Sequence, residues 1–295
     1  MAGPDREAEA AREHLMRVAF RMLGTVAEAE DAVQEAYVRW VRLSDDERRG
    51  IRNPAAWLTT ATTRVCLDML GSAAHRREAY VGPWLPEALP VRTPLVDGGD
   101  PATRAQLRSS VSTALLRLME QMTPAERVAV VLHDVFGYSF AEIGEMLARS
   151  AGAARELASS GRKHLAAHKR NDVDAKLHRE TVAAFRGASE SGDVTELVRL
   201  LDPRVVLTSD GGGLVRAALN PIHGPDKVAR FLLGVAQRRP DVRTALGETA
   251  DGAAVLFIDG SGVSAVVNFE VGEAGVTQVW IQWNPRKLGE WAKRT

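Results

Sequence analysis

The segment from residues 27 to 40 predicts a helix with one face that must be buried and one acidic face that stays exposed. Its apolar side chains recur every third or fourth position, at Val33, Ala36, Tyr37, Trp40 and Val41. The other side of this helix carries Glu30, Asp31, Gln34 and Glu35. The apolar face requires other helices to cover it. The acidic face is either an ordinary solvated surface or a docking surface for a basic partner.

Length and composition exclude several classes of protein. A chain of 295 residues with 45% hydrophobic content is long enough for two or three domains and too polar for a membrane protein. Its charged start lacks the apolar stretch of a signal peptide, so we expect a cytoplasmic protein without membrane segments. The single cysteine, Cys66, excludes internal disulfides, and its apolar neighbours favour a small core residue over a nucleophile.

The charge balance gives no sign of a dedicated nucleic-acid-binding protein. Lys and Arg together number 38, as do Asp and Glu, so the formal net charge is zero. DNA-binding domains are usually basic. A neutral chain can nevertheless carry a basic face on one of its parts.

Helical signals dominate the first two thirds of the chain and are interrupted once. Asn53 followed by Pro54 caps a helix that continues through Val65. The stretch from 82 to 101, rich in proline and glycine, predicts a linker. Thr123 and Ser139 each begin a capping box, and a third helix follows Ser150. Short helices at this spacing predict a helix-turn-helix.

Beyond residue 174 the pattern changes from helices to strands. Helical segments at 177–189 and 193–201 are followed by β-rich segments at 205–209, 253–259, 263–271 and 276–283. Helices first and strands after predict a separate α+β domain with an antiparallel sheet.

Four segments resemble one known family. Residues 31 to 40, D-A-V-Q-E-A-Y-V-R-W, resemble the helix with which bacterial sigma factors of the extracytoplasmic-function (ECF) class grip the clamp of RNA polymerase. Residues 84–87, 210–213 and 284–288 resemble W-L-P-E-P, D-G-G-G-K and N-P-D-K-L, the signatures of an ECF subgroup with a fused C-terminal SnoaL-like domain. Leu214 stands where the family has the lysine of the second signature.

The resemblance implies a multidomain chain in which two all-α sigma domains precede an α+β domain of the cone-shaped SnoaL-like type. Sigma domain two would occupy residues 1–82, a linker 83–103, sigma domain four with its helix-turn-helix 104–172, and the SnoaL-like domain 173–295.

The resemblance also implies which residues meet the partners. The polymerase-binding candidates are Asp31, Gln34, Glu35 and Trp40. The DNA-binding candidates are Asn53, Trp57, Arg64, Arg76, Arg77, Ser150, Arg155, Arg162 and Lys163.

Several side chains that the family uses on DNA are replaced. Arginines are usual near positions 69, 71 and 74, where this chain has Met69, Gly71 and Ala74. Glu156 is an acid where an amide is usual. Gly152 and Gly161 each cost roughly 1 kcal/mol of helix propensity in the recognition helix. The chain therefore either binds an unusual promoter or has lost part of its DNA-binding surface.

In the C-terminal domain the candidate regulatory or pocket residues are Asp210, Gly211, Gly212, Gly213, His223, Asn268, Trp280, Trp283, Asn284 and Pro285. A SnoaL-type enzyme of the cyclase or isomerase class would use Asp210 and His223 as an acid-base pair. The alternative is that these are turn residues and aromatic core. His164 and His168 lie four apart, but no third ligand is apparent, so no metal site is expected.

We therefore predict an ECF sigma factor that directs promoter-specific transcription initiation and is regulated by its SnoaL-like domain. Its partners would be core RNA polymerase and promoter DNA, with a small-molecule ligand in the C-terminal domain as a further candidate and no cofactor. The alternative is a sigma-factor-like protein that works as an enzyme or a small-molecule binder in the SnoaL-like cavity.

Overall fold

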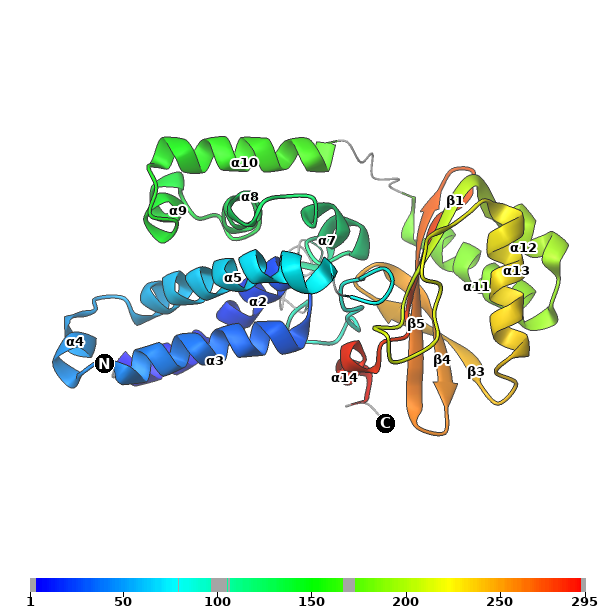
Figure 1. Ribbon diagram of the computed structural model, residues 1–295, viewed down its shortest axis with the longest axis horizontal. Helices are drawn as coiled ribbons and strands as arrows, with labels where there is room; N and C mark the ends of the chain where they lie inside the picture. The colour runs from blue at the N-terminus through cyan, green and yellow to red at the C-terminus, as the bar shows by residue number, and fades with distance from the viewer. Residues whose placement is uncertain (1–3, 79, 97–104, 106, 167–172, 293–295) are drawn as a thin grey trace. The chain divides into compact units, whose positions relative to one another are not determined.

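The structure, a computed structural model, describes residues 4–78, 80–96, 105, 107–166 and 173–292 (Figure 1). These residues form two compact units. Unit 1 contains the described residues of 4–78, 105–111 and 115–166, and unit 2 those of 80–96, 112–114 and 173–292. The segment 83–103, predicted as a linker, therefore belongs to unit 2 as far as Val96.

Within its described residues, all regular elements of unit 1 are helical. Its elements are α1 (Pro4–Ala10), α2 (Arg12–Leu23), α3 (Val26–Arg42), α4 (Asp45–Gly50), α5 (Pro54–Glu78), α7 (Thr113–Met119, whose first residues belong to unit 2), α8 (Pro124–Val130), the π-helical turn η1 (Val131–Val135), α9 (Phe140–Met146) and α10 (Ala151–Ala166).

Helices α2, α3 and α5 pack against one another as a bundle. The apolar face of α3 is buried as predicted, at Ala29, Ala32, Val33, Ala36 and Trp40. Cys66 on α5 is buried as well, which confirms it as a core residue, and burial raises the pKa of its thiol. A thiol with a raised pKa carries little thiolate and is a poor nucleophile.

Helices α8, α9 and α10 form the helix-turn-helix portion of unit 1. The capping boxes predicted at Thr123 and Ser139 are both present. Gly161 on α10 is buried, and a Cβ at this position would lie 2.7 Å from Val130 Cγ2 on α8. Glycine is therefore needed for the close approach of α10 to α8, which corrects the interpretation of Gly161 as a loss of helix propensity alone.

Unit 2 contains a six-stranded sheet and its covering helices. Its elements are α11 (Ala175–Ser191), α12 (Val194–Leu200), β1 (Leu201–Asp210), β2 (Ile222–His223), α13 (Pro225–Gln237), β3 (Arg243–Thr249), β4 (Gly252–Asp259), β5 (Gly262–Gly272), β6 (Gly275–Gln282), the 3-10 turn η2 (Pro285–Lys287) and α14 (Gly289–Ala292).

The strand order is β2-β1-β6-β5-β4-β3, and β1 and β6 run parallel whereas all other neighbours are antiparallel. The predicted α+β class is correct, but the expectation of a wholly antiparallel sheet is wrong at the β1–β6 pair. In sequence, α13 and the β3-β4-β5 meander lie between β1 and β6. This long connection allows β6 to run beside β1 in the same direction. The prediction also lacked β2, β3 and α13.

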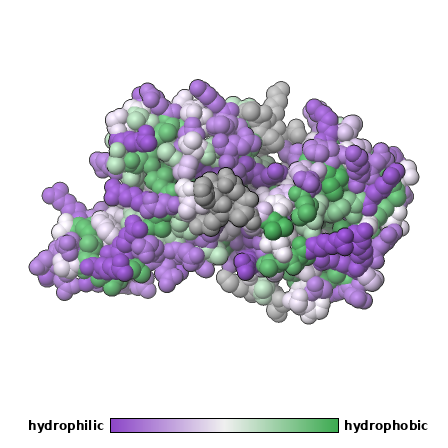
Figure 2. Space-filling model, in the orientation of Figure 1, coloured by the Kyte–Doolittle hydropathy of each residue, from purple (hydrophilic) through white to green (hydrophobic). Residues whose placement is uncertain are grey.

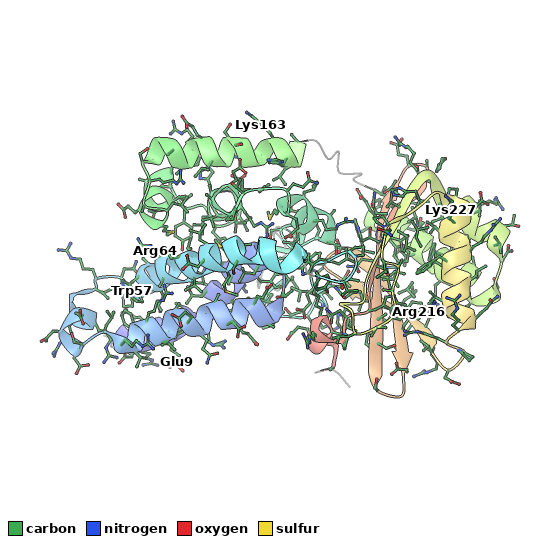
Figure 3. The ribbon with its side chains drawn as sticks, viewed as in Figure 1. Glu9, Trp57, Arg64, Lys163, Arg216 and Lys227 are labelled. Atoms are coloured by element: carbon green, nitrogen blue, oxygen red, sulfur yellow. The ribbon has the colours of Figure 1, made fainter. Side chains whose placement is uncertain are left out.

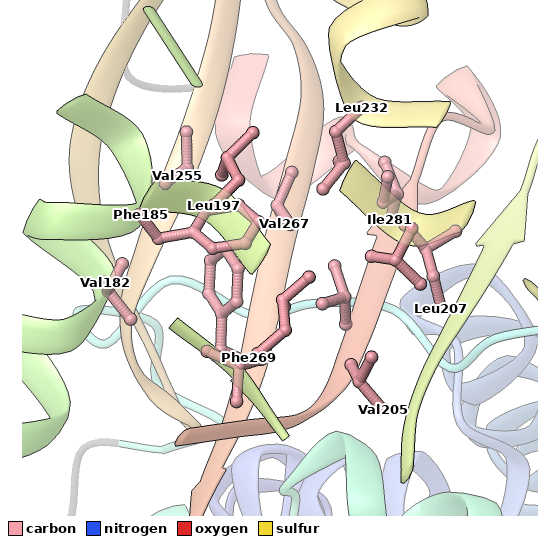
Figure 4. Packing of buried hydrophobic residues seen from close by; sticks show 14 of the residues in the cluster. Val182, Phe185, Leu197, Val205, Leu207, Leu232, Val255, Val267, Phe269 and Ile281 are labelled. Carbon is pink, nitrogen blue, oxygen red and sulfur yellow. The ribbon is translucent and has the colours of Figure 1, made fainter. Parts of the chain in front are cut away.

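The two faces of the sheet have different covers because successive side chains of a strand alternate. One face packs on α11, α12 and α13 and forms the main core, which includes Val182, Phe185, Leu197, Leu232, Val255, Val267, Phe269 and Ile281 (Figure 4). The other face carries Ala254, Leu256 and Val266, which pack with Ala88, Leu288 and Trp291. Ala88 belongs to the segment 80–96, so this segment covers the second face.

Candidate functional sites

The exposed side of α3 is acidic, as predicted. Thr25 caps the helix by accepting a hydrogen bond from the Glu28 N–H. Asp31 and Gln34 are exposed, and Glu35 is partly exposed and pairs with Arg39 at 2.9 Å between Oε1 and Nε. An ion pair of this kind at the surface contributes under about 1 kcal/mol, so Glu35 remains available to a stronger partner.

Trp40 does not belong to this exposed surface. Its side chain is 2% exposed, its indole Nε1–H donates to Asp5 Oδ1 at 3.2 Å, and its ring meets that of Trp57 edge-on at 5.4 Å. Trp40 therefore anchors α3 inside the bundle, which corrects its assignment as a polymerase contact. The physical reason is its place on the apolar stripe of the helix.

On α5, the candidate DNA-binding residues take different positions. Asn53 caps the helix by accepting a hydrogen bond from the Ala56 N–H at 3.0 Å. Trp57 is half-buried against Trp40. Arg64 is exposed, and its guanidinium donates to the Met146 and Glu145 carbonyls at 3.3 and 3.4 Å (Figure 3). The side chains of Arg76 and Arg77 lie outside the described residues.

On α10, two of the four candidates are committed to the structure of unit 1. Ser150 caps the helix through its hydroxyl, which accepts from the Ala153 N–H at 3.1 Å. Arg162 forms a two-point contact with Asp134, and this hydrogen bonding raises its pKa. Arg155 and Lys163 are exposed, with Arg155 5.4 Å from the centre of the Phe140 ring. The basic surface of α10 is therefore sparse, as the sequence predicts.

Two buried arginines of unit 1 are missing from the sequence prediction. Arg21 is completely buried, and its guanidinium donates to Ser110 Oγ at 2.7 Å and to the Leu107 and Arg17 carbonyls. Arg127, 4% exposed, donates to the carbonyls of Met119 and Met22 and pairs with Glu120. Burial lowers the pKa of Arg21 to about 9 and that of Arg127 to about 10, so both stay charged at neutral pH.

In unit 2, Asp210 at the end of β1 is the centre of a buried polar cluster. Its carboxylate accepts four hydrogen bonds among the described residues: from Lys287 Nζ at 2.8 Å, the Leu85 N–H at 2.9 Å, the Tyr80 hydroxyl at 2.6 Å and the Gly212 N–H at 3.0 Å. Desolvation and the bond to Asp210 raise the pKa of Tyr80, which keeps its hydroxyl protonated. The cluster thus joins β1, η2 and the segment 80–85.

Lys287 makes further contacts with the segment 80–85. Its ammonium also donates to the Leu85 carbonyl at 2.6 Å and lies 4.2 Å from the centre of the Trp84 ring. Asn284 donates to the Tyr80 hydroxyl at 3.0 Å, and Pro285 begins the turn that carries Lys287. The predicted signatures around 84, 210 and 284 therefore meet at one place.

The glycines after Asp210 are required by this arrangement. A Cβ at Gly211 would lie 2.1 Å from the Val215 carbonyl oxygen, and one at Gly212 would lie 2.3 Å from Asn284 Nδ2. Gly212 and Gly213 also have positive φ angles, +60° and +72°. The turn therefore presents a bare backbone to its neighbours.

Further along, the same segment adds hydrogen bonds to the sheet. Gln282 donates to the Pro86 carbonyl at 3.3 Å, and the Trp291 indole donates to the Ala88 carbonyl at 2.7 Å. Pro90 and Thr249 form an isolated β-bridge at the edge strand β3. Residues 80–91 are thus held along their length by unit 2.

The remaining pocket candidates do not line one cavity. Asn268 bonds Thr249, Thr113 and Asp251 at 2.6–3.0 Å, on the face that the segment 80–96 covers. Trp280, its partner in the β5–β6 register, is 5% exposed and faces the same way. Trp283 lies on the opposite face, against Phe257.

The proposed acid-base pair is not assembled. His223 is exposed on β2 and lies opposite Val206, whereas Asp210 is four residues further along β1, a separation of about 13 Å at the rise of a strand. Asp210 is in addition already neutralised by Lys287. The geometry therefore gives no support to a catalytic role for Asp210 and His223.

A cavity of about 460 Å³ is present elsewhere in unit 2. It lies on the helix-covered face of the sheet, and its apolar walls include Phe185 from α11, Leu232 from α13, Phe257 from β4 and Phe269 from β5. These residues are not among the site residues predicted from the sequence, because apolar side chains at helix and strand spacing predict a filled core equally well.

Comparisons with known proteins agree with this architecture. The Sigma-70 region 2 family matches residues 8–76, and the Sigma-70 region 4 family matches residues 112–165. The chain is 46% identical over 235 residues to the ECF RNA polymerase sigma factor SigJ of Mycobacterium tuberculosis, an alignment that covers 79% of this chain and 73% of the relative. This chain is an ECF sigma factor.

Two further matches cover nearly the whole ECF sigma factor. It is 32% identical over 283 residues to the M. tuberculosis protein named "Probable ECF RNA polymerase sigma factor SigI", over 94% of this chain and 92% of the relative. The crystal structure of M. tuberculosis SigJ superposes with a TM-score of 0.72 at 34% identity, over 96% of this chain and 97% of that one. The predicted family and fold class are thereby confirmed, and so is the role in promoter-specific transcription initiation.

The region 2 match covers α2, α3 and most of α5, and the region 4 match covers α7 to α10. In the sequence, the segment 80–96 therefore lies between the two sigma regions. Hydrophilic residues prevail on the face in Figure 2, and none of the helices described here combines the length and hydrophobicity of a membrane span.

Proposed function

We propose that this sigma factor binds core RNA polymerase through Asp31, Gln34 and Glu35 on the exposed face of α3. Supporting this, these side chains project from a well-capped helix whose other face is locked into the bundle. Complementary charge at such a surface governs the association rate and the docking register. Trp40 is excluded from the contact because it is buried.

Promoter DNA would be contacted by the exposed basic residues Arg155 and Lys163 of α10 and by Arg64 of α5, with Asn53 and Ser150 fixing the starts of the two helices. Few phosphates can be neutralised by so few cations. The sigma factor would therefore depend on the polymerase for much of its affinity for promoters. Since polymerase and chromosome share the bacterial cytoplasm, the protein would work there.

We base the regulatory part of the proposal on the hydrogen bonds that Asp210 and Lys287 form with residues 80–85. In sequence, these residues join the two sigma regions. If unit 2 binds the segment that joins the two sigma regions, less of that segment is free to extend between them. The distance by which the two regions can separate is then smaller. Because the unit is covalently attached, its effective concentration is high and a modest interface suffices.

We also propose that the cavity of unit 2 accepts a small molecule that adjusts this hold. The cavity shares the sheet with the segment 80–96, which lies on the opposite face. A ligand that shifts β4 or β5 would therefore move the residues that the segment contacts.

The test is run-off transcription with core polymerase and the full chain. The Tyr80→Phe variant loses the hydroxyl that bonds Asp210 and Asn284, and we expect it to change transcript yield by several-fold. Tyr37→Phe is the matched control, since it loses one hydroxyl bond, to the Ala8 carbonyl, within unit 1. Equal yields from Tyr80→Phe and wild type would contradict the regulatory role, and failure of the wild type to bind polymerase would contradict the docking role.

A further inference from the structure

The cavity of unit 2 has walls that suit a hydrocarbon. Its walls include the apolar side chains Phe185, Leu232, Val255, Phe257, Val267 and Phe269; all of these except Phe257 are labelled in Figure 4. Its volume of about 460 Å³ lies within the range of roughly 300–1,000 Å³ found for small-molecule sites. A ligand of one or two rings fits such a space and gains affinity from the apolar area that it buries.

The rim of the cavity, in contrast, is charged. Three arginines and one acid contribute to it: Arg186, Arg239, Arg243 and Glu190. Glu190 pairs with Arg186 at 3.2 Å and also accepts a hydrogen bond from the Thr244 hydroxyl. This leaves Arg239 and Arg243, neither of which has a carboxylate within ion-pair distance among the described residues.

Arg239 is the better placed of the two. Its guanidinium lies 4.2 Å from the centre of the Trp283 ring, and Trp283 in turn contacts the cavity residue Phe257. Stacking on an aromatic face fixes the plane of a guanidinium and leaves its N–H edge for a planar acceptor. The nearby carboxylate of Asp259 has its pKa lowered mainly by hydrogen bonds from Ser261, and the charge of Arg239 is the weakest cause of that lowering. Asp259 is therefore bonded mainly to Ser261.

We infer that this cavity binds an apolar, ring-containing monocarboxylate, with its rings among the phenylalanines and its carboxylate on Arg239 and Arg243. The inference rests on the proposed function, because it names the ligand class of the cavity proposed there. A carboxylate matches the two-point geometry of a guanidinium. A multiply charged ligand is disfavoured, since the apolar walls offer no further partner for its charges.

The test is isothermal titration of the full chain, without polymerase, with two probes of similar shape. Sodium 2-naphthoate carries the carboxylate, and 2-naphthalenemethanol is its neutral counterpart. We expect wild type to bind the naphthoate more tightly than the alcohol by about tenfold or more, the effect of one charged hydrogen-bonded contact. Arg239→Gln should reduce this preference, with Arg243 left at the rim.

Two further variants locate the site. Arg238→Gln is the matched control, because it removes a neighbouring exposed arginine that does not line the cavity, and it should leave both affinities within twofold. Ala236→Trp places a large side chain at an exposed rim position and should block both probes. Absence of binding, equal binding of the two probes, an unchanged preference in Arg239→Gln, or full binding by Ala236→Trp would overturn the inference.

Run-off transcription with and without 2-naphthoate separates this inference from the proposed function. Binding with unchanged transcription would leave the ligand class in place and contradict the regulatory role of the cavity. A change in transcription that persists in Arg239→Gln would contradict the ligand class and leave regulation in place.

Discussion

Lys287 Nζ lies 2.8 Å from Asp210 Oδ2, and the two side chains are 6% and 0% exposed. Taking both charges out of water costs several kcal/mol per ion unless their other polar atoms are also bonded. Tyr80 and Leu85 supply those bonds from the segment that joins the two sigma regions. The stability of the ion pair and the position of the segment are therefore coupled.

Lys287→Met should destabilise unit 2 by about 3–5 kcal/mol, because it leaves the Asp210 carboxylate buried without its cation. It should also release residues 80–91, seen as faster proteolysis there. Denaturant unfolding and limited proteolysis measure the two effects. Lys227→Met, which removes an exposed lysine from α13, should change neither, and an equal response of the two variants would contradict the coupling.

Asp31→Arg combined with Glu35→Arg should abolish co-elution with core polymerase while the helix content stays unchanged. The substitutions reverse the charge of the exposed face, and the buried face of α3 is untouched. Glu180→Arg with Glu273→Arg makes the same change in net charge at exposed positions of unit 2 and should co-elute like wild type. Undiminished association of the α3 variant would exclude this face as the docking surface.

Glu156→Gln combined with Ser159→Arg should tighten binding to duplex DNA and steepen its salt dependence by about one unit of slope. Both positions are exposed on α10, on the side that carries Arg155 and Lys163. Glu156→Gln combined with Ser160→Arg adds the same charge, but its arginine stands at a half-buried position bonded to Glu126, so its effect should be smaller. Filter binding at several salt concentrations measures it, and weaker binding by the double variant with Ser159→Arg would mean that the native residues already fit DNA.

Unit 1 should lose stability in acid through Glu126. Hydrogen bonds from Ser160 and from the Thr123 backbone lower the pKa of this carboxyl below its ordinary value of about 4.3. A lowered pKa stabilises the fold above the ordinary value, and this contribution is lost as the pH falls through the lowered pKa. Glu126→Gln should therefore be less stable than wild type at pH 7, and this difference should be smaller at pH 3, measured by urea unfolding.

The control for this pH dependence is Glu145→Gln, an exposed position on α9. It removes one exposed carboxylate from unit 1 and leaves the Thr123–Glu126 capping box intact, so it shows how much of the effect belongs to the box. A constant difference for Glu126→Gln across the range would contradict the role of its carboxylate.

Much of unit 1 could be predicted because its signals are local. The capping boxes at Thr123 and Ser139 and the apolar period of α3 act within a few residues, so the chain specifies them without distant partners. Trp40 shows the limit of such signals. Its periodicity predicts burial, whereas the resemblance assigns it to the polymerase surface, and only the packing of Trp57 and Asp5 decides between them.

The family, the order of helices before strands, and the three signatures around residues 84, 210 and 284 can all be read from local patterns in the chain. The folded structure was needed to show that these signatures meet, that Arg21 and Arg127 are buried, and that the cavity lies away from Asp210 and His223. The reason is that a buried charge needs partners from segments far apart in the chain. Asp210 meets Leu85 across 125 positions and Lys287 across 77, and no local pattern records such pairings.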